Sequence, residues 1–200
     1  MFSATLDHLV VTAATVEDGA AHIQSAVGIA TGPGGRHARL GTWNRLLSLG
    51  DCYMEAIAVD PEAGPPDHAR WFGLDDRTGP PRLTHWAVAV SDLDAAVAAH
   101  PHAGDVLSFE RNGLRWRMAV PPDGRYAFDD LFPALLQWET DPPSLPPSGA
   151  RLASLTLSHP DAPALAAELG ALLDDPRVAA REGEARLSAR IDTPDGPRDL

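Results

Sequence analysis

The sequence predicts an α+β fold made of two copies of a strand–helix–three-strand (βαβββ) unit, followed by a β-α-β extension. The first observation is a strand with one histidine that occurs twice, within residues 6–11 and 83–90. The second is that each copy leads into a helix start, where a hydroxyl at Thr15 or Ser91 stands three residues before an acid. The third is a partial repeat of this pattern near the end of the chain, where apolar and polar residues alternate over 152–157 and leucines at helical spacing follow.

The first unit covers residues 1–60. Its elements are predicted at about 5–11 (strand), 15–27 (helix), 43–49 and 52–59 (strands). The turn at Gly50-Asp51 joins the last two strands as a hairpin. The Gly-rich stretch 31–37 lacks the Lys-Ser/Thr of a phosphate loop and enters no helix, so we do not expect it to bind phosphate.

The second unit repeats this order over residues 83–141. Its elements are predicted at about 84–90 (strand), 91–100 (helix), 105–110, 114–120 and 133–139 (strands). Asn112-Gly113 predicts a tight hairpin, because both residues tolerate positive φ. The two units are joined by residues 61–82, which are rich in proline, glycine and charge and are typical of a linker laid over the surface. Residues 150–200 form the predicted β-α-β extension.

Composition narrows the classes of partner and compartment. At 200 residues the chain suits one compact domain or two tightly joined modules. A net charge of −12 argues against a nucleic-acid partner, since phosphate binding needs clustered cations. The single cysteine, Cys52, excludes an intramolecular disulfide and a thiolate metal cluster. The chain shows neither a signal-peptide pattern nor an apolar run of about 20 residues, so we expect a soluble, cytoplasmic protein without a membrane partner.

The repeated histidines, His8 and His85, lie at equivalent places and predict a shared site. Each unit ends in a strand with a polar residue in an apolar run: Glu55 in the first, and Gln137 or its neighbour Glu139 in the second. Imidazoles, a carboxylate and an amide form a mixed N/O set suited to Zn²⁺, Ni²⁺, Fe²⁺ or Mn²⁺, which could act as a Lewis acid on a carbonyl oxygen.

Ordinary structural roles remain open for the same residues. A histidine on a strand is often a hydrogen-bonded core residue, and alternation does not decide between Gln137 and Glu139. Glu55 could instead pair with an arginine of the first unit, namely Arg36, Arg39 or Arg45.

The chain resembles the vicinal oxygen chelate superfamily, and within it the glyoxalase-like domain proteins. The resemblance rests on Asp7-His8-Leu9-Val10-Val11, Gly34-Gly35-Arg36-His37, Gly41-Thr42-Trp43-Asn44-Arg45-Leu46, Tyr53-Met54-Glu55, Thr84-His85-Trp86, Leu136-Gln137-Trp138 and Ser158-His159-Pro160-Asp161. It implies that the paired βαβββ modules form a curled sheet around a cleft. It also implies that His8, Glu55, His85 and Gln137 are the ligands of a divalent metal ion.

Three residues of the first unit are candidates for binding substrate oxygens in this cleft: His37, Thr42 and Asn44. His37 is also a candidate for proton exchange together with Glu55, because imidazole titrates near neutral pH. The alternative for all three is loop architecture, in which such side chains tie turns together through backbone hydrogen bonds.

Three functions are consistent with these features. The leading hypothesis is a glyoxalase-like, metal-dependent lyase or isomerase acting on a small oxygenated, carbonyl-containing substrate. The second is a metal-free small-molecule binding protein of the antibiotic-sequestering kind, with tryptophans lining its cleft. The third is a structural or regulatory domain with a vestigial cleft, since one scaffold hosts many chemistries. The resemblance also makes a homodimer possible.

Overall fold

The computed structural model describes residues 2–200 and has two βαβββ units in tandem. The first unit consists of β1 (Ala4–Thr12), α1 (Val16–Val27), β2 (Arg36–His37), β3 (Thr42–Ser48) and β4 (Tyr53–Val59). The second consists of β5 (Arg82–Val90), α2 (Leu93–Ala99), β6 (Asp105–Arg111), β7 (Leu114–Val120) and β8 (Ala134–Trp138), with short helices η2 (Pro101–Ala103) and α3 (Ala127–Asp130) between strands. The predicted α+β class is confirmed.

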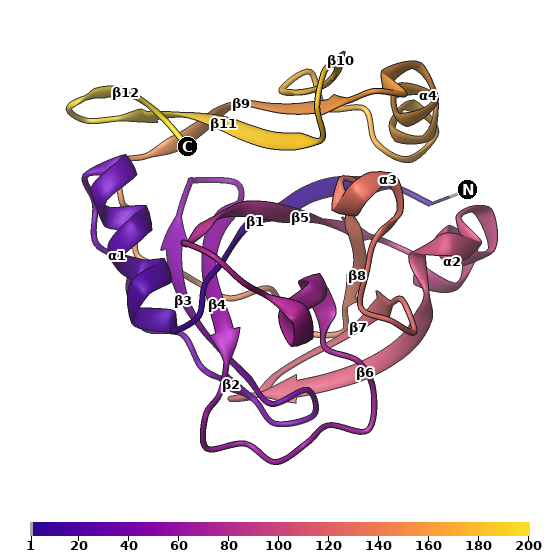
Figure 1. The fold of residues 1–200 in the computed structure, drawn as a ribbon, viewed down its shortest axis with the longest axis horizontal. Coiled ribbons are helices and arrows are strands. Elements are labelled where there is room, and N and C mark those ends of the chain that lie inside the picture. Colours follow the sequence, from indigo (N-terminus) through magenta and orange to yellow (C-terminus); the bar gives the residue numbers. More distant parts are fainter. Residues whose placement is uncertain (1) are drawn as a thin grey trace.

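The eight strands of the two units form one sheet in the order β2-β3-β4-β1-β5-β8-β7-β6. In each unit the first strand pairs in parallel with the last, and the units join through the antiparallel pair β1–β5. The sheet curls until its edges approach each other, as Figure 1 shows for β2 and β6. The Arg39 guanidinium donates a hydrogen bond to the carbonyl of Ser108 across this junction, 3.0 Å away. The result is a nearly closed cup.

Capping explains where the two long helices of the units begin. The Thr15 hydroxyl accepts a hydrogen bond from the amide of Asp18 at the start of α1, as predicted. At α2 the prediction was off by one residue, because Asp92 rather than Ser91 accepts from the helix amides. The Ser91 hydroxyl instead accepts from the amide of Ser3, which ties the start of the chain to this corner.

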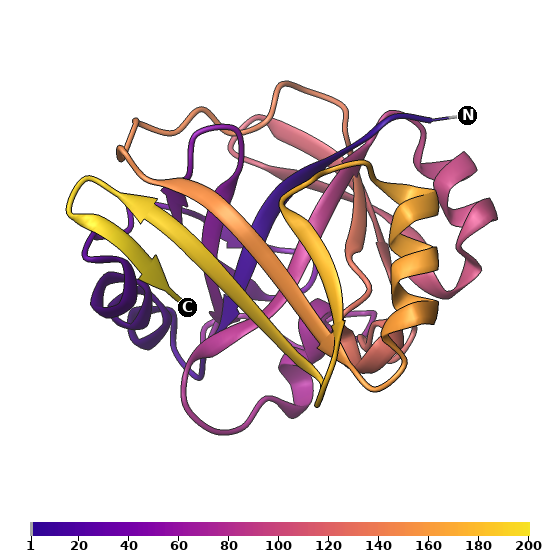
Figure 2. The same ribbon diagram turned by 90° about the horizontal axis from the view of Figure 1, so that it is seen from above.

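The C-terminal region forms a second sheet that lies over the convex face of the first (Figures 1 and 2). It consists of β9 (Arg151–His159), α4 (Ala162–Leu172), β10 (Val178–Glu182), β11 (Arg186–Thr193) and β12 (Gly196–Asp199), with strand order β10-β9-β11-β12. The extension therefore has two strands more than predicted, because β10 and β12 carry polar and proline-containing sequences without a clear alternation. Leucines of β9 and β11 pack with outward-facing residues of β1 and β5.

The connection 60–82 does not stay on the surface as predicted. Its middle forms a short 3-10 segment, η1 (Trp71–Asp76), whose first four residues are buried inside the cup. Trp71, Phe72 and Leu74 join the apolar cluster on the concave face, beside residues such as Val10 and Ile57. Their burial follows from the hydrophobic effect, since a short apolar stretch in a polar linker is stabilised when it fills a cavity. Among the described residues, no helix is both long and apolar enough to cross a membrane.

Candidate active site

A small polar pocket lies inside the cup, against η1. Its volume is about 30 Å³, roughly enough for one ordered water. Its polar lining comes from β1, β2, β3, β4 and β6, and comprises His8, His37, Asn44, Glu55 and Arg111. Its walls are aromatic, and include Tyr53, Trp71, Phe72, Trp116 and Trp138. A few convergent polar groups in an apolar cavity are typical of a ligand site.

His8 and Glu55 form the centre of the pocket, on the adjacent strands β1 and β4. Nε2 of His8 lies 3.4 Å from Oε2 of Glu55, and each residue is only 5% exposed. The imidazole stacks on the ring of Tyr53 at a centroid distance of 4.7 Å. A carboxylate at this depth requires partners, and His8 supplies one of them.

A β-bulge brings Asp7 to the same place as His8. The pairing of β1 with β5 shifts between Leu6 and His8, which leaves Asp7 as an extra residue in the strand. Oδ1 of Asp7 lies 2.6 Å from Nδ1 of His8, and Oδ2 accepts a hydrogen bond from the indole of Trp138 at 2.8 Å. Asp7 therefore fixes the imidazole so that its other nitrogen faces Glu55.

Asn44 on β3 holds the opposite side of Glu55. Its Nδ2 donates a short hydrogen bond to Oε1 of Glu55. Its Oδ1 accepts from the amide of Gly35 at 2.8 Å and from the guanidinium of Arg111 at 2.7 Å. Two donors on Oδ1 fix the orientation of the amide group, so the NH₂ group must face the carboxylate.

His37 on β2 is held in one tautomer. Arg111 donates to its Nε2 at 2.9 Å, so Nδ1 carries the proton and donates to the Thr42 hydroxyl at 2.9 Å. Burial, followed by the positive charge of Arg111, lowers the pKa of His37 to about 3. The expectation that this imidazole titrates near neutral pH is therefore not met. His37 acts as a neutral acceptor that orients Arg111, and Thr42 supports His37 from outside the pocket lining.

The His8–Glu55 pair is ionised at neutral pH. Burial alone would lower the pKa of His8, but the hydrogen bonds and charges of Asp7 and Glu55 outweigh it and raise the pKa to about 9. Burial alone would raise the pKa of Glu55, but His8 and Asn44 outweigh it and hold the pKa below its ordinary value. The site is therefore an imidazolium–carboxylate pair in an aromatic pocket.

A comparison of the whole sequence with protein-family models identifies the family of this chain. The profile of the glyoxalase-like domain matches residues 6–173, most of the chain. The chain belongs to the glyoxalase-like domain family. This places it in the vicinal oxygen chelate superfamily, as its motifs predicted. No protein among the curated ones matches the sequence significantly.

Solved structures are similar to this glyoxalase-like chain at the level of the fold. A hypothetical protein from Staphylococcus aureus aligns with a TM-score of 0.64 and 11% identity, over 92% of this chain and 87% of that one. A methylmalonyl-CoA epimerase from Mycobacterium tuberculosis aligns with a TM-score of 0.45 and 18% identity, over 68% and 88% of the two chains. A methylmalonyl-CoA epimerase from Streptomyces coelicolor aligns with a TM-score of 0.46 and 15% identity, over 72% of this chain and 100% of that one.

His85, a predicted metal ligand, lies on the concave face but outside the pocket. It lines a larger cavity of about 920 Å³ between the cup and the C-terminal sheet, and Phe72 lines both cavities. The ring centroids of Phe72 and His85 are 5.1 Å apart. Phe72 therefore stands between His85 and the His8–Glu55 pair.

A chain of hydrogen-bonding groups also holds one nitrogen of His85. Nε of Arg77 donates to the Thr12 hydroxyl at 2.9 Å, the Thr12 and Thr84 hydroxyls lie 3.0 Å apart, and the Thr84 hydroxyl lies 2.8 Å from Nδ1 of His85. The other nitrogen, Nε2, faces Asp130 at 3.6 Å, beyond hydrogen-bonding distance. Burial lowers the pKa of His85, which favours the neutral form of its imidazole.

Gln137, the fourth predicted ligand, faces the other side of the sheet. Its Oε1 accepts from the amide of Leu93 at 3.0 Å, and its Nε2 donates to the carbonyl of Ser91 at 3.2 Å. These bonds fix Gln137 at the start of α2, while its neighbours Leu136 and Trp138 line the pocket. Glu139, its rival, does not line the pocket either.

The predicted four-ligand metal set is therefore not assembled. In the described part of the chain, the ligand atoms of His8, Glu55 and His85 are not all within 4.8 Å of one another, although those of His8 and Glu55 are 3.4 Å apart. His8 and Glu55 offer two adjacent donors, which is fewer than the three protein ligands of a typical catalytic zinc site. The residues present do not fit the predicted metal centre.

The sequence prediction missed Asp7, Arg111 and the aromatic residues of η1, whereas tryptophans were expected to line the cleft and Trp116 and Trp138 do so. The signal for Asp7 was a second ionisable residue next to His8 in an apolar strand. For Arg111 the strand pattern gave no signal, because its approach to Asn44 depends on closure of the sheet.

The Gly34-Gly35 pair is explained by close packing at this site. A Cβ at Gly34 would overlap the backbone oxygen and the side-chain oxygen of Asn44, and one at Gly35 would lie 2.7 Å from Cδ of Arg111. We expect Gly34→Ala to lower the free energy of unfolding by roughly 1–3 kcal/mol, because backbone must move to admit the methyl group. Urea unfolding measures this. Gly64→Ala is the matched control, since a Cβ there meets nothing within 4 Å; equal losses for both would contradict the explanation.

Proposed function

We propose that the protein is a glyoxalase-like isomerase or lyase that moves a proton on a small carbonyl-containing substrate. The observation that carries the proposal is the buried, ionised Glu55, held on one side by His8 and on the other by Asn44. An ionised carboxylate in a pocket with little water has the protonation state of a general base.

The proposed chemistry uses three groups of the pocket. Oε2 of Glu55 removes a proton from the carbon next to the carbonyl, and the electron pair of that C–H bond moves onto the carbonyl oxygen. The positive charges of His8 and Arg111 stabilise the resulting enolate oxygen. In a 2-hydroxy carbonyl substrate, return of the proton to the former carbonyl carbon, with transfer of the hydroxyl proton to the enolate oxygen, completes an isomerisation. Loss of a leaving group with its bonding electrons from the β-carbon, as the enolate returns to a carbonyl, completes a lyase reaction. Asn44 orients Glu55, and His37 orients Arg111.

Substrate entry requires η1 to move. The pocket of about 30 Å³ is too small for a carbonyl compound of several carbon atoms. Phe72 and Gly73 both have left-handed backbone angles, with φ of 60° and 58°. This backbone is strained at Phe72, which is not a glycine, and strain of this kind is found at ligand clamps. We infer that the substrate displaces Trp71 and Phe72.

Glu55→Gln tests the proposal. The amide has the size of the carboxylate but cannot take the proton, so we expect turnover to fall by about 10²–10⁴-fold. The assay is exchange of substrate C–H protons with D₂O, followed by NMR over a panel of small 2-oxo and 2-hydroxy carbonyl compounds. Glu110→Gln, at an exposed position of β6, is the control. A Glu55→Gln variant with the exchange rate of the wild type would rule out the proposed base.

The aromatic walls favour a second candidate, a metal-free small-molecule binding protein. Such a protein would bind an aromatic ligand between Trp71, Trp116 and Trp138 without changing it. Tight binding with no exchange by any compound of the panel would favour this candidate over catalysis. A resident divalent ion, a homodimer and a cytoplasmic location stay predictions.

A further inference from the structure

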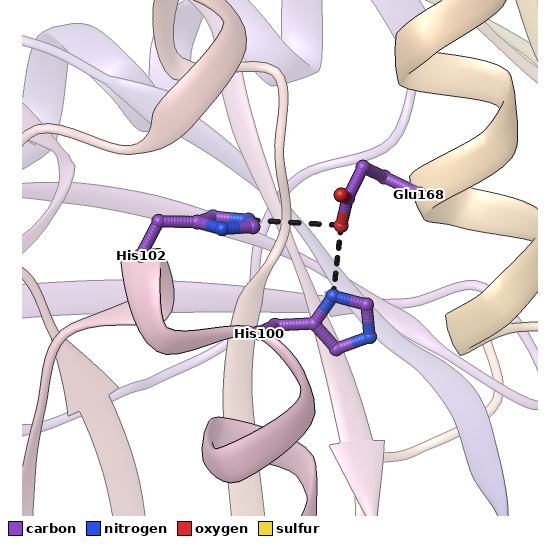
Figure 3. Close-up of side chains that lie close together, drawn as sticks. All are labelled: His100, His102 and Glu168. Carbon is purple, nitrogen blue, oxygen red and sulfur yellow. Dashed lines mark hydrogen bonds and ion pairs between the residues drawn. The ribbon is translucent and has the colours of Figure 1, made fainter.

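A second group of ligating side chains lies far from the pocket, where α4 meets the end of α2 (Figure 3). His100 caps α2, His102 lies in η2, and Glu168 is on α4. One ligand atom from each lies within 4.8 Å of the others. Nδ1 of His100 is 2.8 Å and Nε2 of His102 is 3.9 Å from Oε2 of Glu168. The sequence signal, a His-x-His pair, was not used in the prediction.

We propose that His100, His102 and Glu168 bind a divalent cation of the zinc class, which fastens α4 to the end of α2. Two imidazole nitrogens and a carboxylate oxygen are ligands that Zn²⁺ accepts, with water in the fourth position. Ligand atoms at 2.0–2.2 Å from a tetrahedral ion stand roughly 3.4 Å apart. The two distances to Glu168 lie on either side of this value, so small side-chain rotations suffice.

The two imidazoles are held in place without an ion. Pro101 separates them within a 3-10 turn, which is closed by a hydrogen bond from the amide of Ala103 to the carbonyl of His100 at 2.9 Å. Both rings pack on Phe132, with centroids 5.4 and 4.4 Å away. A site whose ligands are already oriented loses less entropy on binding.

Charge and access also suit a cation. Within residues 2–200, Glu168 forms ion pairs with these two histidines and with no arginine. The cluster therefore carries one uncompensated negative charge when both imidazoles are neutral. The side chains of His102 and Glu168 are 35% and 37% exposed, so an ion and its water ligand reach the site from solvent.

The elements that the ion would join belong to different layers. α2 and η2 are part of the second βαβββ unit, whereas α4 belongs to the C-terminal sheet region, and both views place α4 beside α2 (Figures 1 and 2). Binding to the folded chain alone stabilises the fold by mass action. The ion would therefore link the eight-stranded sheet of the cup to the C-terminal sheet region.

Calorimetric titration of the chelator-treated full-length chain with Zn²⁺ tests the site. We expect about one ion per chain and a thermal midpoint that rises with Zn²⁺ concentration. His102→Ala and Glu168→Gln should each weaken binding at least tenfold and abolish the rise. Glu168→Gln keeps the size of the side chain, so it decides the question if His102→Ala folds poorly.

Two controls locate the ion. His22→Ala removes an imidazole from α1, outside the cluster, and Glu55→Gln removes the carboxylate of the pocket. Both should bind Zn²⁺ as the wild type does. No stoichiometric binding by the wild type, unchanged affinity in Glu168→Gln, or loss of binding in Glu55→Gln would each overturn the proposal.

Discussion

The free energy of unfolding is expected to be highest near pH 6.5 and to fall on both sides. The reason is that the fold shifts the pKa values of two buried histidines of the same pocket in opposite directions. The pKa of His37 is lowered to about 3, whereas that of His8 is raised to about 9. An unfolded histidine titrates at about 6.5. Each histidine therefore makes the free energy of unfolding depend on pH on one side of pH 6.5 only.

The signs follow from proton counts. Between pH 3 and 6.5 an unfolded His37 binds a proton that the folded one does not, so stability rises with pH. Between pH 6.5 and 9 a folded His8 keeps a proton that the unfolded one has lost, so stability falls with rising pH. Each shift of one pKa unit is equivalent to about 1.4 kcal/mol, so the acid limb from His37 is about 5 kcal/mol and the alkaline limb from His8 is about 3 kcal/mol. Glu55, with its lowered pKa, adds to the loss on the acid side.

Urea unfolding at a series of pH values checks this profile. His8→Gln should flatten the alkaline limb and leave the contribution of His37 to the acid limb, whereas His37→Gln should remove that contribution. NMR titration of the imidazole signals gives the two pKa values independently. A profile without an alkaline limb, or one that His8→Gln does not change, would contradict the ion pair with Glu55.

The fold was predictable because its signals are local. Each strand of the two units except β2 alternates or forms a short apolar run, the caps lie beside their helices, and Asn112-Gly113 marks its own hairpin with φ of 49° and 82°. The two-residue strand β2 falls in the Gly-rich stretch 31–37 and was not predicted. The repeated histidine-bearing strand then indicated that a second unit follows the first with the same order of elements. The polar strands β10 and β12 were missed because neighbouring strands, rather than their own pattern, stabilise them.

The site was predictable only in part because its assembly is non-local. Glu55 was identified as a carboxylate that needs a partner, and the structure supplies His8 and Asn44. The side chain of Gln137 was assigned to the cleft, but β8 is apolar on both sides, so alternation does not tell which face is inside. Nothing in residues 61–82 indicates that Trp71 and Phe72 fill the cup, since the space they occupy exists only after both units have paired.

Phe72→Ala is expected to have the largest effect of any single change at the pocket. The side chain is 3% exposed and lies between the small pocket and the cavity of about 920 Å³ that His85 lines. Its loss should lower the free energy of unfolding by about 3–5 kcal/mol, since a buried aromatic ring leaves a void. It should also join the two cavities and open the His8–Glu55 pair to ligands. Acrylamide quenching of tryptophan fluorescence measures the opening, because Trp71 and Trp116 line the pocket.

Three variants separate the loss of packing from the opening. Phe72→Leu keeps most of the volume and should cost less than about 1.5 kcal/mol without added quenching. Leu155→Ala, in the core between the two sheets, should lose a comparable free energy to Phe72→Ala and leave the quenching unchanged. Phe72→Gly should be more stable than Phe72→Ala by about 1 kcal/mol, because φ of 60° strains every residue except glycine. Equal quenching in Phe72→Ala and Leu155→Ala would mean that Phe72 does not separate the cavities, and substrate entry would then have to occur elsewhere.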